Sequence, residues 1–257
     1  MRFQPFCVAA RKAADPLPNQ RMTQADATAG IAARVAMVRA RIAAVCHEAR
    51  RSPDSVTLVA VCKTFDAETV RNGLAAGLRD LGENRVQEAQ AKIPQVGGGR
   101  WHLVGHLQRN KARVATQLFS LIHSVDSVRL ARRLEAVREG RPCDVLIQVN
   151  LTGAQTQGGI EPSGLSELAS VLDRETGLTM RGLMTIGPMD GDVAASRACF
   201  RRLRELRDAL RGSLPNQPIA ELSMGMTDDL DVALKEGATI VRVGRAIFGA
   251  RSTAPGP

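Results

Sequence analysis

Aromatic side chains are scarce in this chain of 257 residues, which has no tyrosine, one tryptophan and six phenylalanines. Proteins that hold single-stranded nucleic acid stack bases on aromatic side chains set among basic ones, and no such interleaving occurs here. The formal charge of +9 has another origin. Residues 1–25 contribute +3, because they hold four basic residues and one acidic residue. The rest is spread over expected helix faces, so we predict no nucleic-acid partner.

Cysteine pairs and long apolar runs are also missing. The chain has an odd number of cysteines and no CxxC pair, which excludes a disulfide framework and a zinc motif. No set of His, Cys, Asp and Glu has metal-ligand spacing, so we predict no metal. No apolar run approaches membrane-spanning length, and residues 1–21 lack the apolar segment of a secretory signal. We expect reduced thiols in a cytoplasmic protein without a membrane partner.

The two ends of the chain stand apart from its centre. Residues 1–25 are basic and poor in acids, which is typical of a disordered extension, of a non-native start upstream of Met22, or of a transit peptide. Residues 252–257 are predicted to be a short tail. No linker is visible between residues 56 and 251, so residues 26–251 are expected to form one domain.

Short apolar runs alternate with helical patterns along that domain. Residues 27–51 have the spacing of an amphipathic helix that Pro53 stops. Eight runs then have the length of strands: 56–62, 78–82, 101–105, 121–125, 144–150, 180–186, 220–224 and 239–244. A helix between each pair indicates parallel βαβ units, and eight strands close a barrel. We predict a single (β/α)8 barrel of the TIM type with an extra N-terminal helix. An open doubly wound sheet is the alternative, but its GxGxxG is absent.

Lys63 follows directly on an apolar run, residues 58–62, that is predicted to be buried on both faces. A charged amine at the end of such a strand is costly unless something uses it. At a barrel mouth, partly desolvated and near other cations, a lysine loses its proton readily and can form an imine with an aldehyde or ketone. The alternative is a lysine that extends from the strand end to water.

The ends of the last two predicted strands suggest a phosphate site, because barrels often bind phosphate with these loops. Ser223 offers a hydroxyl, Gly225 allows close approach of the backbone, and Thr227 is predicted to cap the next helix. The last strand leads to Gly244 and Arg245, whose backbone N–H groups could hold an anion at a helix start. Ordinary turn chemistry is the alternative. A lysine facing a phosphate site fits either a lysine aldolase for a sugar phosphate or pyridoxal 5′-phosphate (PLP) bound as a cofactor.

Eight stretches between about residues 29 and 251 match one family: VAVCKT, LGENRVQEAQ, WHLVGHLQRNK, HSVD, DVLIQVNL, RGLMTIG, ELSMGMTDDLDVAL and VRVGRAIFGAR. Through them the chain resembles the pyridoxal phosphate homeostasis proteins, formerly described as alanine-racemase-like. The resemblance implies a fold-type-III PLP-binding barrel without the second β-domain of alanine racemase. It also implies a role in vitamin B6 homeostasis without robust catalysis.

The resemblance assigns roles to individual residues. Lys63 would hold PLP as a Schiff base, the internal aldimine. Ser223 and the backbone of Gly244 and Arg245 would hold the phosphate, and Arg242 would lie at the pyridine nitrogen or the phosphate. Three more residues fall on segments expected to line the pocket, and these are Asn84, His106 and Met184.

This chain departs from the family pattern at three places. Arg245 stands where many members have threonine or serine, so a hydroxyl contact to phosphate is replaced by charge or by backbone alone. Arg85 replaces the aromatic residue of a common GENY motif. The loop TGAQTQGG, residues 152–159, lacks a lysine that relatives often carry, so a role for that lysine in cofactor transfer is not expected here.

Carriage of the cofactor is favoured over catalysis. A two-base racemase needs an acid/base group opposite the lysine, usually tyrosine, and His106 or Cys62 would have to substitute without a visible orienting partner. His102 is expected to be structural, and His123 could reach the pocket or pack in the core. We therefore predict a monomeric, non-enzymatic carrier that delivers PLP to apo-enzymes. The alternatives are a weak racemase-like enzyme and a lysine-dependent aldolase.

Overall fold

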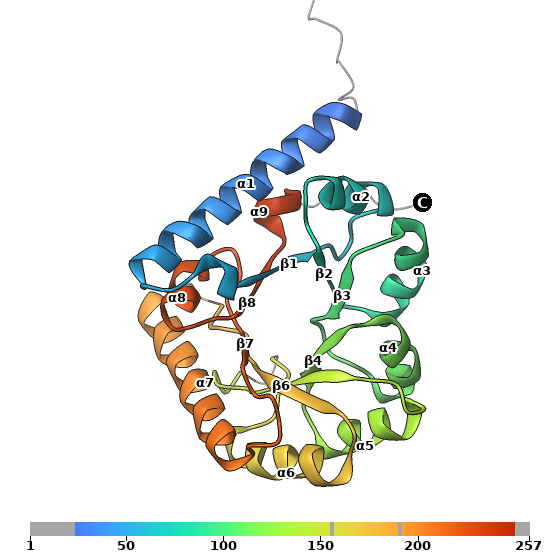
Figure 1. Ribbon diagram of the computed structural model, residues 1–257, viewed down its shortest axis with the longest axis vertical. Coiled ribbons are helices and arrows are strands. Elements are labelled where there is room, and N and C mark those ends of the chain that lie inside the picture. The colour runs from blue at the N-terminus through green and yellow to red at the C-terminus, as the bar shows by residue number, and fades with distance from the viewer. Residues whose placement is uncertain (1–23, 155–156, 190–191, 250–257) are drawn as a thin grey trace, which may run out of the picture.

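Eight parallel strands form a closed barrel in the computed structural model, which describes residues 24–154, 157–189 and 192–249. Each strand pairs with the next in the sequence, and β8 pairs with β1. Figure 1 shows the strands around a central opening of the ribbon with helices outside them. The strands are β1 Thr57–Val61, β2 Asp80–Glu83, β3 Arg100–Leu103, β4 Leu121–Val125, β5 Asp144–Gln148, β6 Thr179–Met184, β7 Glu221–Ser223 and β8 Ile240–Val243. The predicted barrel is confirmed.

Helices cover the outside of the barrel and connect successive strands. They are α1 Gln24–Glu48, α2 Ala67–Ala75, α3 Val86–Val96, α4 Ala112–Leu118, α5 Val128–Val137, α6 Leu165–Glu175, α7 Val193–Ser213, α8 Leu230–Lys235 and α9 Arg245–Phe248. The extra N-terminal helix α1 packs against α2, α8 and α9, as Figure 1 shows. No described helix has the length and apolarity needed to cross a membrane. The predicted tails lie almost wholly outside the described residues, so their boundaries stay predictions.

Two groups of buried apolar side chains stabilise the fold. The larger lies between the barrel and its helices and includes Phe200, Leu81 and Leu103, each fully buried. Burial of each such side chain contributes about 1.5–3 kcal/mol. The smaller group fills part of the barrel interior and consists of Val59, Val104, Leu121, Leu146, Met184 and Ile240. Successive side chains of a strand point to opposite faces, so β1, β4, β5, β6 and β8 contribute to both groups.

Polar side chains occupy the rest of the barrel interior, where most barrels pack branched apolar residues. His102, His123, Ser223 and Arg242 are all buried. They come from β3, β4, β7 and β8, and hydrogen bonds join them. This interior therefore holds a polar cluster beneath the carboxyl ends of the strands, where sites of such barrels form.

Candidate functional site

A cavity of about 580 Å³ opens at the carboxyl ends of the strands. Its walls combine apolar side chains with a few cations, as small-molecule sites commonly do. It is lined by Val61, Lys63, Phe65, Asn84, Val104, Met184, Ile186, Met189, Met226, Thr227, Asp228, Arg242, Gly244, Arg245 and Gly249. Phe65 ties one wall to α9, since its ring centroid lies 5.1 Å from that of Phe248.

Side chains of α3 form hydrogen bonds with the backbone on both sides of Lys63. The carbonyl of Cys62 accepts a hydrogen bond from Lys92 Nζ at 2.9 Å. The N–H of Thr64 donates to Glu88 Oε1 at 2.6 Å. Thr64 has φ of 69°, a left-handed conformation that is unfavourable for a β-branched residue. These contacts hold a strained turn and so fix where Lys63, itself half-buried, enters the cavity.

Lys92 is a second lysine near the site, but it is engaged elsewhere. Its Nζ lies 2.5 Å from Glu83 Oε1 and 3.0 Å from Glu88 Oε1, and both Lys92 and Glu83 are buried. Burial opposes the charge on Lys92, but the hydrogen bonds to Glu83 and Glu88 and the negative charge of Glu83 together outweigh it and raise the Lys92 pKa. A lysine held as ammonium is not a nucleophile. Of the lysines in the described ranges, Lys63 alone lines the cavity.

Cations also lie at the neighbouring wall, where strand β8 ends beside β1. Gly244 precedes α9, and a Cβ on it would lie 3.0 Å from the carbonyl oxygen of Val61, so the two strand ends approach closely. The first N–H groups of any helix lack intrahelical acceptors. Arg245 begins α9, and its Nη2 donates to both carboxylate oxygens of Asp228, at 2.7 and 2.6 Å. A charged pair therefore stands at the cavity rim where many family members are expected to carry a hydroxyl.

Arg242 is the buried cation of the cavity wall. Its guanidinium donates to Ser223 Oγ at 2.7 Å and to the carbonyl of Thr185 at 2.8 Å. Burial lowers the pKa of Arg242 to about 10, so the side chain keeps its charge at neutral pH. Ser223 is fully buried and also lies 2.9 Å from Nδ1 of His123. The cavity thus has a fixed positive group whose position depends on the barrel interior.

Six of the nine residues predicted to bind the cofactor line this cavity: Lys63, Asn84, Met184, Arg242, Gly244 and Arg245. Three others lie elsewhere. Ser223 faces the barrel interior as described above. Gly225 has φ of 92°, and a Cβ there would lie 2.5 Å from that of Ala233. His106 is exposed, with Nδ1 3.3 Å from the Asp126 carboxylate.

The predicted helix cap at Thr227 is wrong. Helix α8 begins at Leu230 with Asp229 at its N-cap. Asp229 Oδ1 accepts the N–H of Met226 at 2.6 Å, which closes a turn ahead of the helix. The carbonyl of Thr227 accepts a hydrogen bond from Arg41 of α1 at 3.1 Å. The loop after β7 is therefore anchored to the N-terminal helix, and Thr227 is left at the cavity wall.

Gly105 sets the position of Asn84, which lines the cavity beside Lys63. A Cβ on Gly105 would lie 2.3 Å from the carbonyl oxygen of Asn84, a contact with backbone that no side-chain rotation relieves. We expect Gly105→Ala to displace Asn84, to cost about 1–3 kcal/mol of unfolding free energy, and to weaken ligand binding. Urea unfolding and ligand titration measure both effects. Gly212→Ala, in the exposed last turns of α7 with no neighbour within 4 Å, is the control and should not destabilise.

His123 makes the stability of the fold depend on pH. Burial, then the nearby His102 and Arg242, lower the His123 pKa well below 6.5. The unfolded chain takes up this proton below about pH 6.5 while the folded chain does not, so the unfolded state binds more protons. The free energy of unfolding should fall by up to about 1.4 kcal/mol per pH unit from this group as the pH drops. Urea unfolding between about pH 7 and 5 should show a shallower dependence for His123→Asn, and equal slopes would contradict this account.

No group of three or more His, Cys, Asp or Glu side chains in the described part of the chain could hold a metal ion. The cavity offers one amine and two guanidiniums among apolar side chains.

The chain is similar to known proteins over most of its length. A family model described as the N-terminal domain of alanine racemase matches residues 34–252. The pyridoxal phosphate homeostasis protein of Pseudomonas aeruginosa is 43% identical over 225 residues, which are 86% of this chain and 96% of that protein. The protein of the same name from Escherichia coli strain K12 is 38% identical over 229 residues, 86% of this chain and 97% of that one.

Solved structures show the same barrel. PipY of Synechococcus elongatus, determined with PLP bound, is 39% identical, and the match covers 85% of this chain and 100% of PipY with a TM-score of 0.75. Alanine racemase of Corynebacterium glutamicum, 14% identical over 87% of this chain and 62% of that one with a TM-score of 0.68, shares the fold alone. The barrel is thus of the type found in the N-terminal domain of alanine racemase. The chain belongs to the pyridoxal phosphate homeostasis protein family.

Proposed function

We propose that this chain binds PLP through an imine on Lys63 and serves as a carrier that holds the cofactor and gives it up to other proteins. The observation that carries the proposal is the meeting of one lysine with two guanidiniums, those of Arg242 and Arg245, in a single cavity. The aldehyde of PLP can react with the lysine, and its phosphate can pair with the guanidiniums. PipY, a relative of known structure, was determined with this ligand.

The cavity fits PLP in size and in the chemistry of its walls. Its volume of about 580 Å³ lies in the range of small-molecule sites. Val61, Val104 and Met184 offer apolar contacts to a flat ring, and all three line the cavity. In the proposed reaction the Lys63 amine adds to the aldehyde and one water molecule leaves, so that a C=N bond replaces the C=O bond.

The phosphate is proposed to lie between β8 and α9. The N–H groups that open α9 and the charged Arg245 suit an anion, although Asp228 holds the Arg245 guanidinium in the structure. Arg242 either donates to the phosphate or to the pyridine nitrogen. At the nitrogen, a permanent cation would leave the ring unprotonated and make it a weaker electron sink. Such a site favours binding over the bond-breaking steps that PLP supports in enzymes.

No second base is well placed among the described residues of the cavity, which supports carriage over racemisation. Among the described residues that line the cavity, the ionisable side chains besides Lys63 are Asp228, Arg242 and Arg245, and the carboxylate is paired. Cys62 is buried outside the cavity, where burial raises its pKa and its thiol contacts the carbonyl of Gly82. The relatives are named homeostasis proteins.

We propose a monomeric carrier in the cytoplasm with apo forms of PLP-dependent enzymes as recipients. The four described cysteines are free and buried, and free thiols persist in a reducing compartment. The Arg245–Asp228 pair lines the cavity and is exposed to solvent, and we propose that PLP leaves the cavity past it.

An absorption spectrum of the purified protein with PLP, before and after borohydride, tests the proposal. A protonated imine absorbs visible light, and borohydride removes that band by reducing the imine, whereas an aldolase without cofactor would show no band.

Hydrogen exchange at Cα of alanine in D2O separates a carrier from a racemase. Exchange that depends on Lys63 would overturn the carrier and favour the enzyme, while no exchange above the rate of free PLP supports the carrier.

A further inference from the structure

A line of five polar side chains crosses the interior of the barrel. At one end Arg242 Nη1 donates to Ser223 Oγ at 2.7 Å, and Ser223 Oγ lies 2.9 Å from His123 Nδ1. His123 Nε2 lies 3.0 Å from His102 Nδ1, and His102 Nε2 lies 3.0 Å from Asp80 Oδ1. All five are buried and they come from five different strands. We call this set the interior chain.

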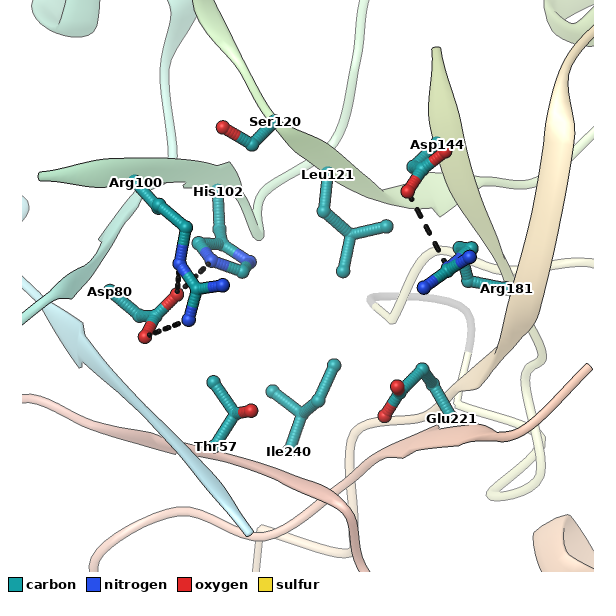
Figure 2. Close-up of a pocket in the computed structure, with 10 residues that line it drawn as sticks. All are labelled: Thr57, Asp80, Arg100, His102, Ser120, Leu121, Asp144, Arg181, Glu221 and Ile240. Carbon is teal, nitrogen blue, oxygen red and sulfur yellow. Dashed lines mark hydrogen bonds and ion pairs between the residues drawn. The ribbon is translucent and has the colours of Figure 1, made fainter. Parts of the chain in front are cut away.

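The two ends of the interior chain face opposite mouths of the barrel. Arg242 lines the candidate PLP cavity. Asp80 is the first residue of β2 and lies at the amino-terminal mouth, in a pocket of about 190 Å³. Figure 2 shows Asp80 there with dashed contacts to His102 and Arg100, while Asp144 and Arg181 form a separate pair across the same pocket.

The chemistry of the two ends fixes the direction of every hydrogen bond between them. A guanidinium can only donate and a carboxylate can only accept. Burial works against the charge of Asp80, but the hydrogen bonds from His102 and Arg100 outweigh it and lower the Asp80 pKa. With both imidazoles neutral, His102 Nε2–H donates to Asp80, and His102 Nδ1 must accept. His123 Nε2–H then donates to His102, so His123 Nδ1 accepts the single proton of the Ser223 hydroxyl.

The hydroxyl of Ser223 therefore accepts a hydrogen bond from Arg242 and donates its single proton to His123. It has no proton left for a phosphate, and Ser223 does not line the cavity. Its role follows from its partners: it holds one arm of the Arg242 guanidinium, while the Thr185 carbonyl holds the other at 2.8 Å.

We propose that the interior chain orients Arg242 for PLP, so that His123, His102 and Asp80 are positioning residues for cofactor binding although none of them touches the cavity. The proposal rests on the proposed function, because it needs PLP beside Arg242. It makes Asp80, at the amino-terminal mouth, a determinant of affinity at the carboxyl-terminal mouth. The directed hydrogen bonds restrain the guanidinium, which reduces the ordering that binding would otherwise require.

The tautomers of the two histidines test the direction of the chain without any variant. In ¹⁵N-labelled protein at mildly alkaline pH, NMR correlation of ring nitrogens and carbons identifies which nitrogen carries the proton. We expect the Nε2–H tautomer at both His102 and His123. The Nδ1–H tautomer at either ring would overturn the proposed direction, whether or not PLP is bound.

Affinity for PLP tests the positioning role, with a matched control at the same mouth. Asp80→Ala removes the terminal acceptor, and we expect the Kd for PLP to rise about fivefold to tenfold, within the usual range of coupling between sites. Asp144→Ala breaks the pair with Arg181 in the same pocket but lies outside the interior chain, and its Kd should stay unchanged. His123→Leu should raise the Kd about tenfold, and His123→Asn, which keeps an acceptor for Ser223, should recover most of that loss.

These outcomes separate the two proposals. Unchanged affinity in Asp80→Ala and His123→Leu, with an imine band that still depends on Lys63, would overturn the interior chain as a positioning device and leave the carrier intact. An equal loss of affinity in Asp80→Ala and Asp144→Ala would assign the effect to the mouth as a whole and also overturn it. Absence of an imine band in the unaltered protein would instead overturn the proposed function, whatever the tautomers.

Discussion

Lys63→Ala is expected to abolish the visible absorption band of the protein with PLP and to raise the Kd by about a hundredfold, or ~3 kcal/mol. The alanine removes the amine that forms the covalent bond and leaves the phosphate contacts and the apolar walls. No other described lysine lines the cavity. The nearby Lys92 cannot replace Lys63, because Glu83 and Glu88 hold its ammonium group. Absorbance titration with PLP measures the band and the Kd together.

Lys111→Ala is the matched control for this change. Lys111 ends a short 3₁₀ helix before α4 and does not line the cavity, so its loss should leave the band and the Kd unaltered. If Lys63→Ala kept the band, another amine would be the partner of the aldehyde and the account of the site would be wrong. Circular dichroism of both variants checks that each remains folded.

Lys92→Met is expected to give the largest loss of stability, about 3–5 kcal/mol of unfolding free energy. The ammonium is buried against Glu83, whose Oε1 lies 2.5 Å away and whose Oε2 has no hydrogen-bond partner among the described residues. Methionine would fill the space but leave a buried carboxylate without its cation. The variant should also weaken PLP binding, since Lys92 Nζ holds the carbonyl of Cys62 beside Lys63.

A double variant separates the charge from the packing. Lys92→Met with Glu83→Met replaces both charges by apolar groups of similar length, and we expect it to recover most of the lost stability but not the affinity for PLP. Lys235→Met is the surface control, because Lys235 pairs with Glu48 in solvent and such pairs contribute less than about 1 kcal/mol. A loss for Lys92→Met no larger than that of the control would contradict the buried pair, and urea unfolding measures all three.

The sequence predicted the barrel because its signals are local. Each apolar run sits between helical patterns, and all eight predicted strands occur, with ends that differ by at most two residues. The N-terminal helix was predicted over residues 27–51 but spans Gln24–Glu48, since Arg50 adopts φ of 53° and Pro53 opens a short 3₁₀ helix. These shifts come from turn conformations, which the apolar periodicity does not encode.

Individual site residues were harder to predict than the fold. Lys63 and Gly244 lie at strand ends and so could be placed from topology alone, whereas Arg242, within β8, was placed through the family resemblance. Ser223 also ends a strand, but the alternation of side chains turns it toward His123 instead of the cavity. His106 lies a few residues beyond its strand, where a loop carries it to the surface beside Asp126.

The interior networks could not be read from the sequence because their members are far apart in it. Lys92 lies on a helix and reaches back to Glu83 and to the carbonyl of Cys62 on neighbouring strands. His123 and Ser223 are 100 residues apart, and only closure of the barrel brings them together. A polar residue at an interior position of a predicted strand, such as His102, is the signal that could have pointed to them.

Peptide mapping of the protein after treatment with PLP and borohydride tests the central claim most directly. Reduction turns the imine into a stable secondary amine, so mass spectrometry can locate the modified residue. The account predicts one pyridoxyl group, on the peptide that contains Lys63 and on its side chain. Modification at another lysine, or spread over several with Lys63 untouched, would contradict it.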